Sequence, residues 1–151
     1  MRFSAKVEYG ILATLALSIH SGQEPLQVRS IAKKQKIPIR FLEQVMNLLK
    51  KQGLVESVRG RQGGYRLTKP PDQIRFGEVL QAIEGPLAMI DSGREGGSFS
   101  NGAEGVENAV IQEVWAEANA SLEKLLNSIT FQDLCERKKE LEGKQVLMFH
   151  I

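Results

Sequence analysis

The sequence predicts a mainly α-helical chain with one small β-hairpin. Apolar residues recur at intervals of three and four along most of the chain, which is typical of helices with one buried face. The period changes to two only in a short stretch from Leu54 to Thr68, which is typical of paired strands. The 151 residues are enough for one domain with a buried core and an appended element, but not for two domains of ordinary size.

The first predicted helix runs from a cap at Ser4 to about His20. Its apolar residues cover nearly every face, so we expect the helix to be buried on more than one side. The longest apolar run in the chain, from Ile11 to Ile19, is about half of the ~20 residues that a helix needs to span a bilayer. We therefore expect no transmembrane helix and no membrane partner.

Two more helices are predicted before the hairpin. The second covers about Val28 to Gln35, and the Ile37-Pro38 pair breaks it. The third ends at Gly53, because glycine best tolerates the left-handed backbone that commonly follows a helix. Four apolar residues of the third helix are expected to face a core: Phe41, Leu42, Val45 and Leu49.

The hairpin is predicted from Leu54–Val58 and Tyr65–Thr68, which are joined by the glycine-rich tip of the stretch SVRGRQGGYRL. Pro70-Pro71 ends the hairpin, and a short helix follows near Gly77 to Glu84. The next segment, residues 85–105, is mostly glycine, serine and charged residues toward its end, so we expect a flexible loop there.

The longest helix is predicted from Val106 to Ser128. Its apolar residues alternate steps of three and four, a spacing that forms a seam for another helix. We expect this seam to be part of a core or of a dimer interface, and a ligand pocket is the alternative. A short helix after Thr130 and a charged tail complete the chain. The seam consists of Ile111, Val114, Trp115, Ala118, Leu122, Leu125 and Ile129.

Charge is distributed unevenly along the chain. Residues 1–70 carry 13 Lys or Arg and 4 Asp or Glu, a net charge of +9, whereas residues 71–151 carry 7 and 14, a net charge of −7. This asymmetry indicates a polyanion-binding half joined to a half with another task. The single cysteine, Cys135, rules out an intramolecular disulfide and favours a reducing cytoplasm. No nucleophile, base and orienting group occur together, so we do not expect an enzyme.

Three helices and a hairpin, with basic residues on the second and third helices and at the hairpin tip, form the arrangement of a winged helix-turn-helix DNA-binding domain. The face of the third helix opposite its apolar residues carries side chains that can bond base edges in the major groove. The expected DNA contacts on the two helices are Arg29, Arg40, Glu43, Gln44, Asn47 and Lys51.

The hairpin tip is expected to act as the wing. Its glycines, Gly60, Gly63 and Gly64, would let the backbone approach phosphates closely. Arg59 and Arg61 are long enough to enter a narrow minor groove. An ordinary hairpin loop with solvated arginines is the alternative. A nucleotide-phosphate loop is not favoured, because the pattern Gly-x-x-x-x-Gly-Lys-Ser/Thr is absent.

Several stretches of the sequence resemble the Rrf2 family of bacterial transcription regulators. They are MRFSAKVEY at residues 1–9, FLEQ at 41–44, GLVESVRG at 53–60, GGYRL at 63–67 and NSITFQDL at 127–134. The resemblance implies a homodimeric winged-helix DNA-binding repressor or activator, whose long helices pair across the dimer. It also implies that base and groove contacts come from Arg40, Phe41, Glu43, Gln44, Arg59 and Arg61.

The sequence departs from many of these relatives in one respect. Many Rrf2 proteins hold an iron–sulfur cluster through three cysteines in the loop that corresponds to residues 92–108, with a histidine completing the set in some. None of those cysteines is present, and Gln112 stands about where that histidine would be. We therefore expect no metal and no cofactor. The remaining candidate ligands are Glu8, which stands where some relatives of that family use a carboxylate ligand, and His20, Cys135 and His150, which have no clustered spacing.

The chain is thus expected to comprise a winged helix-turn-helix domain at 1–84, a flexible loop at 85–105, a dimerisation helix with a following short helix at 106–134, and a tail at 135–151. The expected function is a cytoplasmic, sequence-specific regulator, a repressor, that binds a palindromic operator in double-stranded DNA as a homodimer. Two alternatives stay open: a regulatory module that binds a partner protein, and an iron–sulfur or redox sensor with unusual ligands. The effector or partner protein is not identified.

Overall fold

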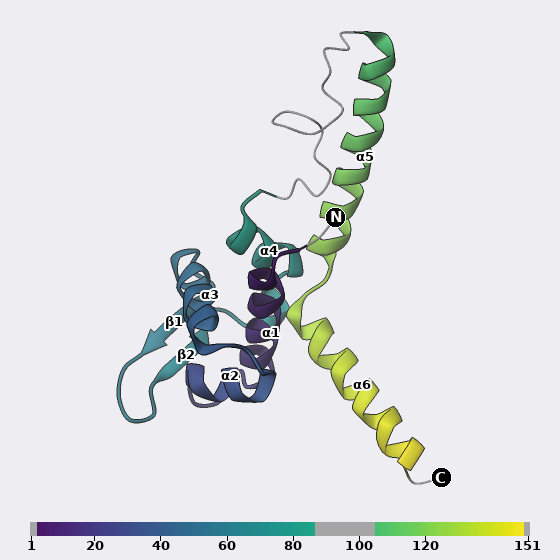
Figure 1. Ribbon diagram of the computed structural model, residues 1–151. Coiled ribbons are helices and arrows are strands. Elements are labelled where there is room, and N and C mark those ends of the chain that lie inside the picture. Colours follow the sequence, from purple (N-terminus) through teal and green to yellow (C-terminus); the bar gives the residue numbers. More distant parts are fainter. Residues whose placement is uncertain (1–2, 87–104, 150–151) are drawn as a thin grey trace.

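The structure is a computed structural model that describes residues 3–86 and 105–149. Helices α1 to α4 and the hairpin gather into one body, from which α5 and α6 extend in different directions (Figure 1). The elements are α1 (Ala5–Ile19), α2 (Val28–Gln35), α3 (Ile39–Lys51), β1 (Val55–Val58), β2 (Gly64–Leu67), a 3₁₀ turn (Pro71–Gln73), α4 (Phe76–Glu84), α5 (Val106–Ser128) and α6 (Phe131–Phe149).

The predicted fold class, mainly α-helical with one small hairpin, is confirmed. Helices α2 and α5 have the predicted bounds, and α1, α3, α4 and the two strands begin or end within about two residues of the predicted positions. Apolar periodicity therefore located these elements, because each of them in the body buries one face against a neighbour.

Helix α1 is the central helix of the body and packs against α3, α4 and α6. It is buried on more than one side, as predicted, and Val7 and Ala13 are fully buried. Two hydroxyl groups on this helix are buried as well. Thr14 Oγ1 donates to the Gly10 carbonyl at 2.7 Å, and Ser18 Oγ donates to the Thr14 carbonyl at 2.7 Å. Bonding within the helix thus avoids the cost of unpaired polar groups in the core.

The core fills the space between α1, α3, α4 and the start of α6. The largest fully buried side chain, Phe131, belongs to the first turn of α6 rather than to the predicted winged-helix segment. The C-terminal part of the chain therefore completes the core of the N-terminal body. Other large side chains with almost no exposed surface are Leu42, Met46, Leu49, Ile74 and Leu80.

The hairpin is anchored through β2 to the connection between α1 and α2. Its strands are antiparallel, with Val55 opposite Leu67 and Val58 opposite Gly64. Leu26 and Tyr65 form a further bridge, in which the Leu26 N–H donates to the Tyr65 carbonyl at 2.9 Å and the Tyr65 N–H donates back at 2.7 Å. These bonds fix the direction in which the hairpin leaves the helices.

A second bridge joins the body to the C-terminal helices. Residues 74–76 lie antiparallel to residues 129–131, around the pair Arg75 and Thr130. The ring of Phe131 stacks on that of Phe76, with centroids 6.1 Å apart and planes inclined by 15°. Two backbone hydrogen bonds close the bridge, from Phe76 N to the Ile129 carbonyl at 2.8 Å and from Phe131 N to the Ile74 carbonyl at 2.9 Å.

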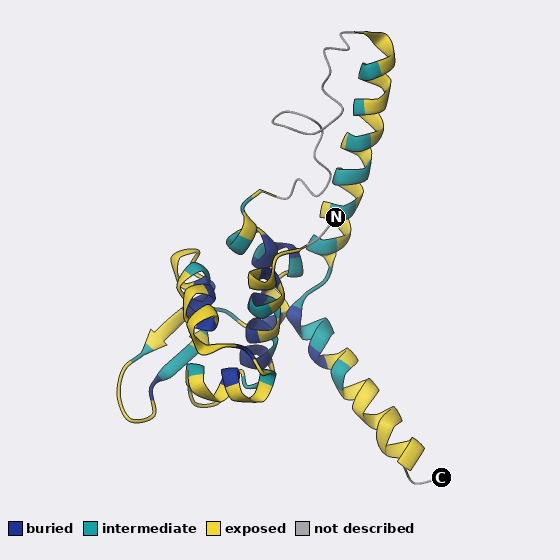
Figure 2. Cartoon of the chain, viewed as in Figure 1, coloured by how far each residue is buried: buried dark blue, intermediate teal, exposed yellow. Residues whose placement is uncertain are grey.

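The apolar seam of α5 is only partly covered by the described part of this chain. No residue of α5 is buried, and Val114 and Leu125 are each 56% exposed. Figure 2 shows only exposed and intermediate residues along this helix. The described chain therefore does not fully bury the seam, and its part in a core or a dimer interface stays a prediction.

The C-terminal region differs from the prediction. A short helix was expected after Thr130, followed by a tail at 135–151, but α6 continues to Phe149. The residues after 135 are mostly good helix formers, and a Lys138–Glu142 ion pair supports the helix at i, i+4 spacing. The high content of charged residues after residue 135 was therefore not enough to indicate a tail. The predicted flexible loop at 85–105 lies almost entirely outside the described residues.

Helix α6 begins with a reciprocal cap. The Thr130 N–H donates to Asp133 Oδ2 at 2.9 Å, and the Asp133 N–H donates to Thr130 Oγ1 at 3.2 Å. The backbone N–H and the hydroxyl of Thr130 lower the pKa of Asp133 below its ordinary value of 3.8, with a smaller contribution from Arg137 and against a small opposing effect of burial.

Removal of the Phe131 ring is expected to destabilise the fold strongly. Phe131→Ala leaves a cavity at a fully buried position, which costs about 3–5 kcal/mol in the free energy of unfolding. Urea denaturation followed by circular dichroism measures this loss. Phe149→Ala is the matched control, because that ring lies in the same helix and is 88% exposed. Equal effects of the two substitutions would contradict the assigned core.

The cap at Asp133 predicts a pH-dependent contribution to stability. Because folding lowers the pKa of this carboxyl group, its contribution is present at neutral pH and is lost as the pH falls through the folded-state pKa, below 3.8. We expect Asp133→Asn to lower the urea midpoint at pH 7 and to have a smaller effect at pH 3. The same difference between the variant and the original chain at both pH values would disprove the charge effect.

Candidate nucleic-acid interface

Helices α2 and α3 form a helix-turn-helix. The connection is short because Lys36 adopts a left-handed conformation, with φ 55° and ψ 43°, directly after α2, and Pro38 precedes α3. Between them, the side chain of Ile37 is only 4% exposed. The pair is held by buried residues on both helices, which are Ile31, Ala32, Leu42, Val45, Met46 and Leu49.

The face of α3 opposite those buried residues is exposed. At about 100° per residue, the four positions predicted to read bases fall within about 60° of one another around the helix axis. The aliphatic core of α3 lies on the other side, so burial of one face forces these polar side chains outward. The four exposed residues are Arg40, Gln44, Asn47 and Lys51.

Glu43 and Phe41 occupy opposite flanks of this stripe. Glu43 is exposed. Phe41 was predicted both to face the core and, by resemblance, to contact DNA, but its side chain is 47% exposed and lies against α1. Its ring centroid is 6.4 Å from that of Tyr9. The assignment of Phe41 to the core is therefore wrong, because its position on the helix faces the edge of α1 rather than the interior.

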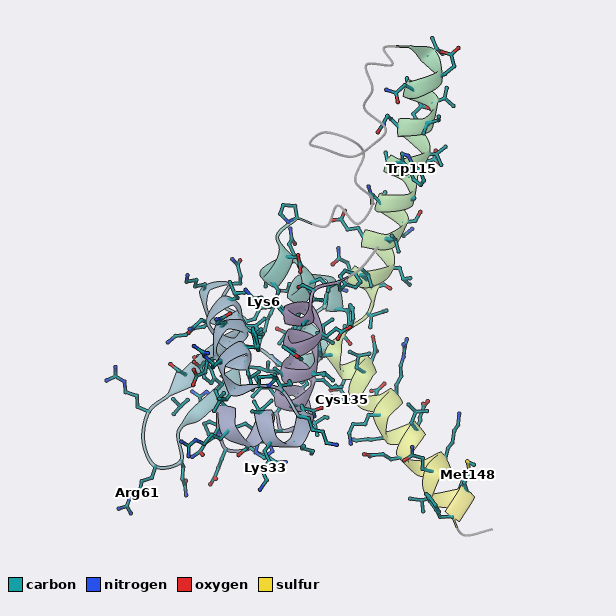
Figure 3. The ribbon with its side chains drawn as sticks, in the orientation of Figure 1. Lys6, Lys33, Arg61, Trp115, Cys135 and Met148 are labelled. Carbon is teal, nitrogen blue, oxygen red and sulfur yellow. The ribbon has the colours of Figure 1, made fainter. Side chains whose placement is uncertain are left out.

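The wing projects from the body with its cations exposed. Arg59 and Arg61 are both exposed. Figure 3 shows Arg61 at the tip of the hairpin, pointing away from the helices. Gly60 has φ +118°, a backbone conformation that side chains disfavour, and its carbonyl accepts a hydrogen bond from the Gly63 N–H at 3.0 Å. The tip is thus a tight turn that carries two outward arginines.

Two of the wing glycines are explained by close contacts within the chain. A Cβ on Gly63 would lie 2.3 Å from the Val58 carbonyl oxygen, and a Cβ on Gly64 would lie 2.2 Å from the Leu26 carbonyl oxygen. Gly64 also has φ +152°. Both glycines were predicted to approach phosphates, but the close approach that the structure shows is to the chain itself. It allows the bridge between Leu26 and Tyr65.

The basic residues of this surface carry charge that the described chain does not neutralise. The ion pairs within the described residues join Arg66 to Glu56, Lys69 to Glu78 and Lys138 to Glu142. Within residues 3–86 and 105–149, the predicted DNA-contact cations take part in none of these pairs. They are Arg29, Arg40, Lys51, Arg59 and Arg61.

Several other cations extend the surface beyond the predicted contacts. Lys33, Lys34 and Lys36 are exposed on α2 and in the turn, and Figure 3 shows Lys33 on the outer side of α2. Lys50 is exposed and donates a hydrogen bond to Ser57 Oγ at 3.0 Å, which links α3 to β1. The run KKQK at 33–36 was the sequence signal for this extension.

The candidate cluster ligands do not come together. Glu8 and His20 lie at opposite ends of α1, about 18 Å apart at 1.5 Å per residue. Cys135 is buried on α6, and burial raises the pKa of its thiol, which disfavours the thiolate that metal ligation requires. His150 lies outside the described residues. The part of the chain that the structure describes has no group of three His, Cys, Asp or Glu suited to a metal, so these residues do not fit an iron–sulfur cluster.

None of the described helices combines the length and the apolar character needed to cross a membrane.

Comparison with known proteins agrees with this geometry. The profile of the Rrf2 family, described as an iron-dependent transcriptional regulator, matches residues 3–137. The chain is 32% identical over 142 residues to the HTH-type transcriptional regulator IscR of Sodalis glossinidius, covering 94% of this chain and 83% of that protein. It is 30% identical over 152 residues to the HTH-type transcriptional regulator CymR of Bacillus subtilis, covering the whole of both.

Solved structures show the same fold. CymR of B. subtilis, described as the global cysteine regulator of that organism, superposes with a TM-score of 0.76 at 28% identity, over 91% of this chain and 98% of that one. IscR of T. potens superposes with a TM-score of 0.74 at 34% identity, over 93% and 90%. The relatives are regulators rather than enzymes. The helix-turn-helix, the wing and these matches together show that the chain belongs to the Rrf2 family of transcriptional regulators.

Proposed function

We propose that this regulator is a repressor that binds a palindromic operator as a homodimer. The observation that carries the proposal is the exposed, unneutralised cationic surface formed by α2, α3 and the wing. A surface of this kind gains free energy on DNA by releasing counterions from the phosphates it contacts. A dimer seated on an operator would block access of other proteins to the same DNA. Because the relatives are bacterial, we place its action on the chromosome in the cytoplasm.

The surface supports a division of roles between helix and wing. Helix α3 would enter the major groove, where Gln44 or Asn47 can bond adenine bidentately and Arg40 can bond guanine. Glu43 on the flank can accept a hydrogen bond from cytosine. Arg59 and Arg61 of the wing would enter the neighbouring minor groove, whose negative potential is greatest where it is narrow.

Other residues of the interface would hold the protein on the duplex without reading its sequence. Arg29 on α2 and Lys51 at the C-terminal end of α3 are exposed cations, and they suit phosphates. Among the wing glycines, Gly60 leaves open space around its Cα, so its backbone can approach DNA closely. Gly63 and Gly64 would act by shaping the wing that presents the arginines.

A homodimer accounts for the partly exposed seam of α5. An amphipathic helix of 23 residues with an exposed apolar seam needs a partner, and steps of three and four allow it to pack against a second copy of itself. Large apolar residues on the helix include Val110, 54% exposed, and Ile111, 53% exposed. Two-fold symmetry would place the two α3 helices in major grooves about 34 Å apart. The proposed interface comprises Ile111, Val114, Trp115, Ala118, Leu122, Leu125 and Ile129.

The alternative is a module that binds a partner protein in place of DNA. The observation that favours it is the exposed apolar end of α6, where Leu147, Met148 and Phe149 are 66%, 77% and 88% exposed. Retention of the purified protein on a DNA column at low salt separates the two functions. A protein that passes through such a column would support the alternative.

Substitutions in the wing and in α3 are expected to have different effects on DNA binding. Arg59→Ala should weaken binding and reduce the preference for a narrow minor groove, because one groove cation is lost. Gln44→Ala should change base preference at one position by ~1–3 kcal/mol. Operator fragments selected from random DNA and then compared by gel shift measure both effects. Uniform losses on all fragments from both variants would contradict the division of roles.

The salt dependence of binding provides the control for this experiment. If the dimer contacts six or more phosphates, affinity should fall by about 10³-fold or more between 50 and 200 mM salt. Arg59→Ala should reduce that slope, whereas Gln44→Ala should leave it unchanged, because glutamine carries no charge. Salt-independent binding would disprove the role of the cationic surface.

The dimer is tested by placing a charge in the α5 seam. Val114→Glu should convert the dimer to a monomer, because each copy would bury an unpaired carboxylate in an apolar interface. Analytical ultracentrifugation measures the change, and DNA affinity should fall with it. Glu113→Ala, an exposed position next to Val114, is the control. A monomeric original chain, or a dimer that persists in Val114→Glu, would disprove this interface.

A further inference from the structure

A cavity lies between the start of α1, the first turn of α3 and the end of α4. Its volume is about 550 Å³, compared with about 230 and 130 Å³ for two other cavities of the described chain. Cavities of about 300–1,000 Å³ are typical of small-molecule sites. The lining residues are Ser4, Ala5, Lys6, Tyr9, Phe41, Ile83 and Glu84.

The walls of this cavity are mostly apolar and partly aromatic. Tyr9 and Phe41 form a pair with ring centroids 6.4 Å apart and planes inclined by 40°, and Ile83 adds an aliphatic surface. Phe41 nevertheless stays 47% exposed, although it is one of the large apolar side chains of α3. An apolar wall left open to water in a concave site suits a ligand with a flat apolar body.

Two opposite charges accompany the aromatic pair. Lys6 is exposed and takes part in no ion pair among the described residues. Figure 3 shows Lys6 near the start of α1. Glu84 accepts a hydrogen bond from the Ser4 hydroxyl, which holds the carboxylate near the cavity without neutralising its charge. A ligand with only one charge would be attracted by one of these groups and repelled by the other.

We propose that this cavity binds a zwitterionic amino acid with an aromatic side chain. The ligand carboxylate pairs with Lys6, its ammonium group pairs with Glu84, and its ring lies against Tyr9 and Phe41. Both charges of the site are then matched, and the apolar wall is removed from water.

Binding at this site is coupled to DNA binding, a step that rests on the proposed function. Phe41 lies next to Arg40 and on the same helical turn as Gln44, which are residues of the DNA surface. Just below the cavity, a Cβ on Gly10 would lie 2.0 Å from Ile83 Cδ1 and 3.2 Å from Val45 Cγ1, so α1, α3 and α4 are in tight contact there. A ligand stacked on Phe41 therefore shifts the first turn of α3 and weakens operator binding.

Calorimetric titration of the full chain without DNA tests the site itself. L-Phenylalanine, phenylacetate, phenethylamine and glycine are the probes, because they keep or remove the ring, the carboxylate and the ammonium group one at a time. We expect saturable binding of L-phenylalanine, with each of the other three probes weaker by about tenfold or more. No saturable binding of L-phenylalanine, or equal binding of the three ring-containing probes, would overturn the proposal.

Matched variants locate the binding. Lys6→Gln should weaken L-phenylalanine binding by about tenfold, and Ala5→Trp should abolish it by filling the cavity. Lys139→Gln, an exposed lysine on α6 outside the cavity, should bind L-phenylalanine as the original chain does. Thermal melting confirms that each variant is folded. Unchanged affinity in folded Lys6→Gln and Ala5→Trp would show that the ligand binds elsewhere.

The coupling is measured on an operator fragment. Saturating L-phenylalanine should weaken operator binding, and saturating operator should weaken L-phenylalanine binding by the same factor, because linked equilibria are reciprocal. Operator binding without any binding of L-phenylalanine would refute the site and leave the proposed function intact. Binding of L-phenylalanine by a chain that binds no DNA would support the site and refute the function.

Discussion

The bridge between residues 74–76 and 129–131 is the contact on which the arrangement of the whole chain depends. It consists of two backbone hydrogen bonds and the stacked rings of Phe76 and Phe131, and Phe131 is fully buried. Arg75 reinforces it by donating to the Asn127 carbonyl at 2.7 Å. Because this contact joins the end of α5 and the start of α6 to the body, any partner of α5 is held at a fixed position relative to α3 and the wing. Because Phe131 also packs in one core with residues of α1 and α3, the acidic half of the chain completes the fold of the basic half.

The polar and cationic character of the proposed DNA-binding surface follows from the position of the core. Burial of one face of α3 against α1 forces the opposite polar face outward. The wing is directed by the bonds between Leu26 and Tyr65, which hold its base to the segment before α2. Its arginines are not neutralised by the described chain, so their charge is available to phosphates. Packing of apolar residues thus orients a cationic surface whose own residues contribute little to the core.

Phe41 illustrates how a residue can serve more than one surface. Phe41 lies on the flank of the proposed base-reading face and also forms a wall of the cavity beside α1. The fold places these two surfaces on adjacent sides of one helical turn. In a tightly packed three-helix contact, a ligand on one side of that turn changes the position of the other side, since packed interiors do not deform continuously. This proximity offers a physical route from a small molecule to an operator.

The sequence by itself determined the helices, the hairpin, the polar stripe of α3 and the lack of clustered cysteines, because periodicity, turn residues and composition are local properties. The sequence could not predict the surroundings of Phe41. The 3.6-residue spacing of a helix does not indicate which neighbouring element a side chain on the flank of the buried face contacts. The sequence predicted that Gly63 and Gly64 approach phosphates, and the structure adds that a Cβ at either position would meet a backbone carbonyl oxygen of the chain. The predicted end of the last helix came too early in the sequence, because charged residues occur in a solvated helix as well as in a tail. The bridge at Thr130, the burial of Phe131 and the cavity at Lys6 were decided only by the tertiary structure, because each joins segments that lie far apart along the chain.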